Sequence, residues 1–317
     1  MALEQRIRET ESRLFASRGL EPEESFVEVT PEGLRLRVLS VGAGPPLVFL
    51  HGVGLAAAIW APWLSHFSGY RAHLVEWPGH GLSDPFTYRA GMVRDHTLGL
   101  VDDLLDRLEL DEAAVIAHSL GGMFALWHAA ARPGRIASLV ALGDPAIALP
   151  GAIARMPLSI LSVPGVGEAF LRTPAPRPVF RRLLSDGLSP AAVDNAPDDL
   201  VEMLRFAVRR GRNPHTVATL MRGINRFRRP RPECVLSADE RRRIAVPTVF
   251  CWGTDDPFLK PAEARPSVAE IPGAVLHEMQ AGHGPWLDQP AICAGMALEH
   301  LSSTGFAPAR RAAAARQ

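Results

Sequence analysis

Short apolar runs, separated by segments of helical periodicity, make up most of this sequence. Five runs are almost wholly apolar and lie at 47–50, 72–77, 113–118, 137–143 and 246–253. Strands that are buried on both faces have this continuous pattern. Between them lie helical patterns, as at 92–108, where leucines recur at helical spacing. The alternation predicts an α/β fold with a mostly parallel sheet that is flanked by helices.

Both ends of the chain have a different pattern. Residues 26–41 alternate apolar and polar positions around a turn at Pro31, Glu32 and Gly33. This alternation predicts a hairpin of two half-exposed edge strands. Residues 2–18 predict an N-terminal helix, and the tail 305–317 has no apolar periodicity.

The strand and helix alternation stops between residues 144 and 240. This segment is rich in proline and then has helical patterns at 198–210 and 215–227. We expect a helical insertion over the carboxyl edge of the sheet. The expected division is an N-terminal helical extension (1–25), a core (26–144 and 241–304), a helical cap (145–240) and a flexible tail (305–317).

Composition and net charge limit the partners that we expect for this protein. The 317 residues are 47% hydrophobic, which suits a globular fold, and the 34 basic residues equal the 34 acidic ones. This balance favours neither nucleic acid nor an anionic membrane surface as a partner. Arginines outnumber acidic residues between 144 and 243, which fits either an anionic substrate or a solvated face.

The cysteines and the N-terminus indicate the cellular context. Cys234, Cys251 and Cys293 are widely spaced and form no metal-binding or disulfide pattern. No secretory signal and no apolar run of about 18 residues is visible. We therefore expect a cytoplasmic protein without a metal site or an integral membrane segment.

Ser119 is the first candidate for chemistry. It follows the apolar run 113–117 directly and precedes the helical pattern of 120–131. A sharp turn from strand to helix exposes the side chain at the bend, with helix amides nearby. A serine before a helix is also a common N-cap. A nucleophilic serine needs in addition a base, an orienting acid and an oxyanion site.

Three further loops supply candidates for these groups. The strand 47–50 ends in His51, Gly52, Val53 and Gly54, where the Val53 amide is placed to join the Leu120 amide as an oxyanion donor. Asp255 and Asp256 follow the strand 246–253. His283 stands between two glycines, where a mobile general base is of use.

The ordered segments HGVG, WPGHGLS, HSLGG, WGTDD and GHGPW resemble the α/β-hydrolase fold family with a helical cap, from about Phe26 to Leu301. The resemblance implies that Ser119 is the nucleophile, His283 the base and Asp256 the acid, with Asp144 as an alternative acid. It also implies substrate contacts from His51, Gly52, His118 and Trp286. Ala117 and Glu76 depart from the family pattern, which more often has glycine and aspartate there.

The resemblance implies hydrolysis of a carboxylic ester or lactone through an acyl-enzyme, with a small-molecule acyl substrate and no cofactor. A serine nucleophile disfavours the aspartate-based epoxide hydrolase and dehalogenase branches. One alternative is a carbon–carbon bond hydrolase, although His118 and Gly284 stand where such relatives often have Asn and Trp. A non-catalytic ligand-binding protein is the other alternative.

Overall fold

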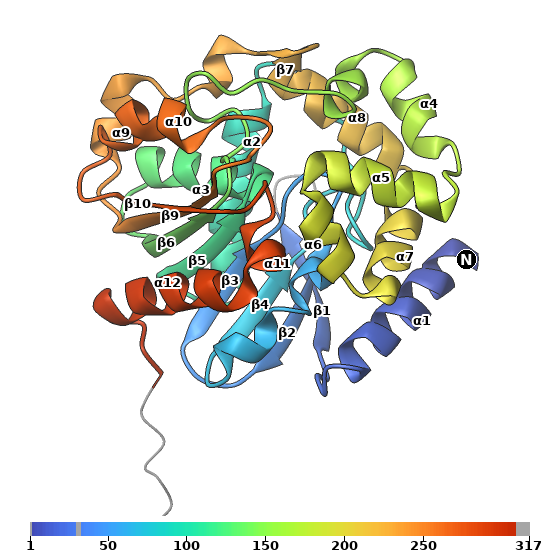
Figure 1. The fold of residues 1–317 in the computed structure, drawn as a ribbon, viewed down its shortest axis with the longest axis horizontal. Coiled ribbons are helices and arrows are strands. Elements are labelled where there is room, and N and C mark those ends of the chain that lie inside the picture. The colour runs from blue at the N-terminus through green and yellow to red at the C-terminus, as the bar shows by residue number, and fades with distance from the viewer. Residues whose placement is uncertain (1, 30–32, 309–317) are drawn as a thin grey trace, which may run out of the picture.

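A computed structural model describes residues 2–29 and 33–308, and these residues form one eight-stranded sheet at the centre (Figure 1). The strand order is β1-β2-β4-β3-β5-β6-β9-β10. The strands are β1 (Glu23–Val29), β2 (Leu34–Gly42), β3 (Pro46–Leu50), β4 (Arg71–Val75), β5 (Ala113–His118), β6 (Ile136–Leu142), β9 (Thr248–Gly253) and β10 (Val275–Met279). All neighbours from β4 to β10 pair in parallel, whereas β2 pairs antiparallel with both β1 and β4. The predicted α/β fold class is confirmed.

Helices pack on both faces of the sheet. The helices outside the predicted cap are α1 (Ala2–Ala16), α2 (Val93–Arg107), α3 (Leu120–Ala131), α10 (Pro261–Val268), α11 (Pro285–Asp288) and α12 (Pro290–Ser303). Strand β5 is buried at every position because its side chains alternate between two apolar layers. Val115 packs in the layer that includes α2 and α3, and Ile116 in the layer that includes α12.

The sheet edges differ from the prediction. Of the two hairpin strands, only β1 is an edge strand; β2 is internal, because it pairs with β1 on one side and with β4 on the other. The other edge is β10, which the apolar pattern missed because most of its residues are only partly buried. Residues 23–25 belong to β1 and not to the N-terminal extension. The hairpin turn at 30–32 and the tail residues 309–317 lie outside the described residues.

The segment between β6 and β9 is mainly helical, as its sequence predicted. It contains η3 (Leu158–Ser162), α4 (Val166–Arg172), α5 (Arg177–Gly187), α6 (Pro190–Asn195), α7 (Asp198–Ala207), α8 (Asn213–Ile224), the short pair β7 (Asn225–Arg226) and β8 (Arg229–Pro230), η4 (Pro232–Cys234) and α9 (Ala238–Arg243). In Figure 1, α4, α5, α6 and α7 group on one side of the sheet, and α1 lies beside α7. Arg13 of α1 donates a hydrogen bond of 2.9 Å to Asp199 of α7.

A buried ionic cluster joins α1 to the sheet. The Arg37 side chain of β2 is only 3% exposed and pairs with Glu11 of α1, Glu24 of β1 and Glu76, which follows β4. The Glu76 carboxylate also accepts the Leu82 amide at 2.7 Å. Because a buried charge is costly without partners, Arg37 compensates several carboxylates at once.

Replacing Arg37 by leucine should therefore destabilise the fold. The Arg37→Leu variant leaves Glu11 and Glu76 buried without their cation, which should lower the free energy of unfolding by about 3–5 kcal/mol. Urea unfolding followed by circular dichroism measures this loss. Arg18→Ala, at an exposed position, is the control and should change the value by less than about 0.5 kcal/mol. Equal effects of the two variants would contradict the role assigned to the cluster.

Candidate active site

Ser119 lies at the turn between β5 and α3 in a rare backbone conformation. Its φ and ψ are 51° and −113°, and it is one of few residues other than glycine with a positive φ among those described. Such conformations cost about 1–3 kcal/mol and persist where the surrounding structure imposes them. In α/β folds, a strained turn of this type between a strand and a helix exposes the side chain at the bend, where a nucleophile can act.

The N-cap interpretation of Ser119 does not hold within the described residues. The Ser119 side chain makes no capping hydrogen bond to α3. Ser189 and Ser237, at the same position of α6 and α9, have extended backbones and accept the amides of Ala192 and Glu240. The Ser119 hydroxyl group is therefore left for another partner.

Close backbone contacts around the turn require small residues. A Cβ atom at Gly121 would lie 2.3 Å from the carbonyl oxygen of Leu50, at the end of β3. A Cβ atom at Gly52 would lie 2.6 Å from Nδ1 of His118. Glycine at both positions allows the loop after β3 to pass directly beside Ser119.

His283 and Asp256 form the second part of the site. Nδ1 of His283 lies 2.7 Å from Oδ2 of Asp256, and both side chains are almost completely buried. The Asp256 carboxylate also accepts the amides of Asp144 at 2.9 Å and Phe258 at 3.0 Å. These donors hold Asp256 in place, and Asp256 orients the imidazole ring of His283.

The helices between β6 and β9 also position His283. Its amide donates a hydrogen bond of 2.7 Å to the carbonyl oxygen of Leu188, at the end of α5. Asp288 accepts the Gly282 amide at 2.7 Å and pairs with the Ser189 hydroxyl group. The sequence analysis missed these roles of Leu188 and Asp288, because no local pattern connects α5 or α6 with the histidine loop.

Asp144, the alternative acid, does not bond to His283. Its carboxyl oxygens are completely buried and have no hydrogen-bond partner among the described residues. Burial, followed by the negative charge of Asp256, raises the pKa of Asp144 well above its ordinary value. Burial therefore favours the protonated, uncharged form of Asp144, and the geometry favours Asp256 over Asp144 as the partner of the imidazole.

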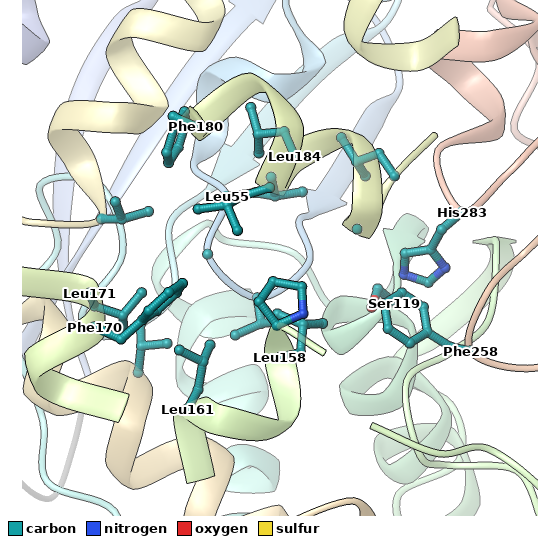
Figure 2. A pocket seen from close by; sticks show the side chains of 18 of the residues that line it. Leu55, Ser119, Leu158, Leu161, Phe170, Leu171, Phe180, Leu184, Phe258 and His283 are labelled. Atoms are coloured by element: carbon teal, nitrogen blue, oxygen red, sulfur yellow. The ribbon is translucent and has the colours of Figure 1, made fainter. Parts of the chain in front are cut away.

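Two cavities meet at Ser119. The large cavity, of about 130 Å³, is lined by Ser119 and His283 at one end (Figure 2). Its remaining wall is apolar and includes Leu158, Leu161, Phe170 and Phe180. The small cavity, of about 40 Å³, is lined by Val53, Ser119 and Leu120 and continues to Asp144 and Asn225. The two candidate oxyanion donors, Val53 and Leu120, thus lie beside the serine.

The four predicted substrate-binding residues separate into two groups. His118 lines the large cavity, and its Nε2 lies 3.0 Å from the His283 carbonyl oxygen. His51, Gly52 and Trp286 are not among the described residues that line either cavity. Trp286 is completely buried, and the centroid of its ring lies 4.5 Å from the centroid of the His118 ring. The assignment of these three residues as substrate contacts therefore stays a prediction.

Both histidines beside the serine are neutral groups. Burial, followed by the charge of His283, holds the pKa of His118 well below its ordinary value. Burial, followed by the charge of His80, does the same for His51. Because Nε2 of His118 faces a carbonyl oxygen, it carries the ring proton and leaves Nδ1 without one.

No group of three or more potential metal ligands occurs in the part of the chain that the structure describes. In that part of the chain the three cysteines are buried and form no disulfide bond. The described helices include none that is both long and apolar enough to cross a membrane.

A serine, a histidine and an aspartate at the carboxyl ends of parallel strands are features of α/β-class hydrolytic enzymes. Residues 45–290 match the family model of the alpha/beta hydrolase fold. The chain belongs to this family and is a hydrolase. Both the fold and the resemblance inferred from the sequence are thereby confirmed.

Individual relatives have different activities. The chain is 27% identical over 258 residues to 2-hydroxy-6-oxononadienedioate/2-hydroxy-6-oxononatrienedioate hydrolase of Cupriavidus pinatubonensis, covering 77% of this chain and 82% of the relative. It is 32% identical over 116 residues to epoxide hydrolase 2 of Siraitia grosvenorii, and this match covers 36% of this chain and 37% of the relative. The carboxylesterase CesB of Bacillus subtilis has a similar structure, with a TM-score of 0.72 and 17% sequence identity. The superposition covers 96% of this chain and 99% of the esterase chain.

Adding a methyl group at Gly121 should disturb the turn at Ser119. Because the new Cβ atom of Gly121→Ala would meet the backbone of Leu50, the free energy of unfolding should fall by about 1–3 kcal/mol. Gly99→Ala, in the middle of α2, meets nothing within 4 Å and should stabilise by about 0.5–1 kcal/mol. Urea unfolding of both variants measures the difference, and a stabilising Gly121→Ala would refute the contact.

Proposed function

We propose that this protein is a serine hydrolase that cleaves a carboxylic ester or lactone through an acyl-enzyme. The observation that carries the proposal is the uncapped Ser119 in a strained turn, in one cavity with His283, whose Nδ1 bonds to Asp256 at 2.7 Å. Nucleophile, base and acid then take the roles of a catalytic triad.

In the proposed acylation step, Ser119 Oγ attacks the ester carbonyl carbon while Nε2 of His283 takes the hydroxyl proton. Asp256 accepts a hydrogen bond from the Nδ1–H group, which fixes the tautomer of His283 and stabilises the imidazolium ion. The amides of Val53 and Leu120 donate to the oxyanion. Collapse of the tetrahedral intermediate breaks the ester bond, and the imidazolium proton passes to the leaving alcohol.

In the deacylation step, Nε2 of His283 takes a proton from water, whose oxygen attacks the acyl carbon. The second tetrahedral intermediate collapses, the ester bond to Ser119 breaks, and the proton returns to Ser119 Oγ. The products are a carboxylic acid and an alcohol, or one hydroxy acid from a lactone. The reaction uses water as its only co-reactant.

Residues 145–240 act as the cap in this proposal. Leu158 and Leu161 of η3, Phe170 of α4 and Phe180 of α5 line the cavity that begins at Ser119 (Figure 2). These side chains suit an apolar part of the substrate. They also exclude water, which strengthens the electrostatic interactions at the oxyanion.

The second candidate is a carbon–carbon bond hydrolase, which the similarity to the Cupriavidus enzyme favours. The name of that enzyme's substrate describes a dicarboxylate. Neither lysine nor arginine occurs among the described residues that line the two cavities at Ser119. Because a buried carboxylate needs a compensating charge, an ester with an apolar component fits these cavities better. The arginine-rich composition of 144–243 therefore does not supply an anion site beside the serine.

The triad assignment predicts a specific order of effects. Ser119→Ala and His283→Ala should lower kcat for p-nitrophenyl esters by about 10⁵-fold or more. Asp256→Asn should cost on the order of 10⁴-fold, because it favours the wrong imidazole tautomer. Asp144→Asn should cost far less, since Asp256 and not Asp144 bonds to Nδ1 of His283.

These rates are measured under saturating substrate, with circular dichroism to confirm that each variant is folded. Ester turnover by Ser119→Ala at the wild-type rate would contradict the proposed nucleophile. Greater damage from Asp144→Asn than from Asp256→Asn would contradict the proposed acid.

A further inference from the structure

The small cavity contains two buried polar side chains without partners. Both carboxyl oxygens of Asp144 and the Oδ1 atom of Asn225 lack a hydrogen bond to any described residue. The two residues are 0% and 2% exposed, and both line the cavity that begins at Ser119. Buried polar groups in native proteins nearly always have a partner, so this cavity is a candidate site for a polar group of a ligand.

The lining of this cavity combines apolar and polar side chains. Ala146, Ile147 and Ile153 form an apolar wall, and Asp144 and Asn225 add polar groups to it. In its protonated form, which complete burial favours, Asp144 offers one O–H donor and one carbonyl acceptor, and the Asn225 amide also offers both functions. A hydroxyl group, which donates and accepts, is complementary to this pair.

The position of His283 indicates which part of the substrate enters each cavity. Ser119 and Val53 line both cavities, whereas His283 lines only the large one of the two and Leu120 only the small one within the described chain. In the proposed mechanism, His283 must deliver its proton to the leaving alcohol. The alcohol part therefore extends into the large cavity, and the acyl part extends into the small one.

We propose that the small cavity is the acyl subsite and that Asp144 and Asn225 select short acyl groups that carry a hydroxyl group. An anionic acyl group is disfavoured, because no lysine or arginine is among the described residues that line the subsite and Asp256 is adjacent to Asp144. This inference rests on the proposed acyl-enzyme mechanism and adds the substrate class. It also gives Asp144 a role in binding in place of its earlier one as an alternative acid.

Two isosteric pairs of benzyl esters test the subsite. The first pair is the lactate and the 2-methylpropanoate, and the second is the 3-hydroxybutanoate and the 3-methylbutanoate. Each pair exchanges one hydroxyl group for a methyl group at the same position and keeps the leaving alcohol. The measured quantity is the ratio of kcat/KM for the hydroxy ester to that for the methyl ester.

Wild-type protein should favour the hydroxy ester in at least one pair. Asp144→Leu and Asn225→Leu should each lower that ratio by about tenfold or more, because a buried hydroxyl group then loses its partner. Asp144→Asn, which keeps a neutral donor and acceptor in the same shape, should retain most of the preference. Intrinsic differences in ester reactivity cancel when the ratio of a variant is divided by that of the wild type.

A ratio that is unchanged by both leucine variants in both pairs would overturn the subsite. If Asp144→Leu fails to fold, Asn225→Leu and the wild-type preference decide the question. A wild-type preference for both methyl esters would mean that the cavity holds only water. Either failure leaves the triad intact if Ser119→Ala still abolishes turnover, whereas wild-type turnover by Ser119→Ala would remove the proposed function itself.

Discussion

The backbone turn at Ser119 is the constraint on which the rest of the site depends. A φ of 51° at a residue with a side chain has to be imposed by its surroundings. Strand β5 is buried on both faces, α3 starts immediately after the turn, and Gly121 packs against the end of β3. The sheet and the helix thus hold the serine hydroxyl group at the junction of two cavities.

Two residues from segments that are distant in sequence hold His283 in place. Asp256, after β9, holds the imidazole ring, and Leu188, at the end of α5, holds the backbone of the same residue. The helical segment therefore contributes to the placement of the base as well as to the cavity wall.

Much of this arrangement could be predicted from local sequence. Continuous apolar runs indicate β3 to β6 and β9 because those strands are buried on both faces, and the loops that follow them carry Val53, Ser119 and Asp256. What local sequence could not predict depends on packing. Strand β10 is only partly buried, the partners of Leu188 and Asp288 are remote in the chain, and Trp286 is turned into the core. The unpartnered carboxyl group of Asp144 became visible only when its neighbours were known.

The most direct test of the central claim is the intact mass of the protein after treatment with a serine-directed fluorophosphonate, followed by peptide mapping. Activation of Ser119 by His283 predicts one adduct per chain, located on Ser119 and absent from the Ser119→Ala variant. An adduct at another residue, or no adduct on a folded wild-type protein, would contradict the assignment of Ser119 as the nucleophile.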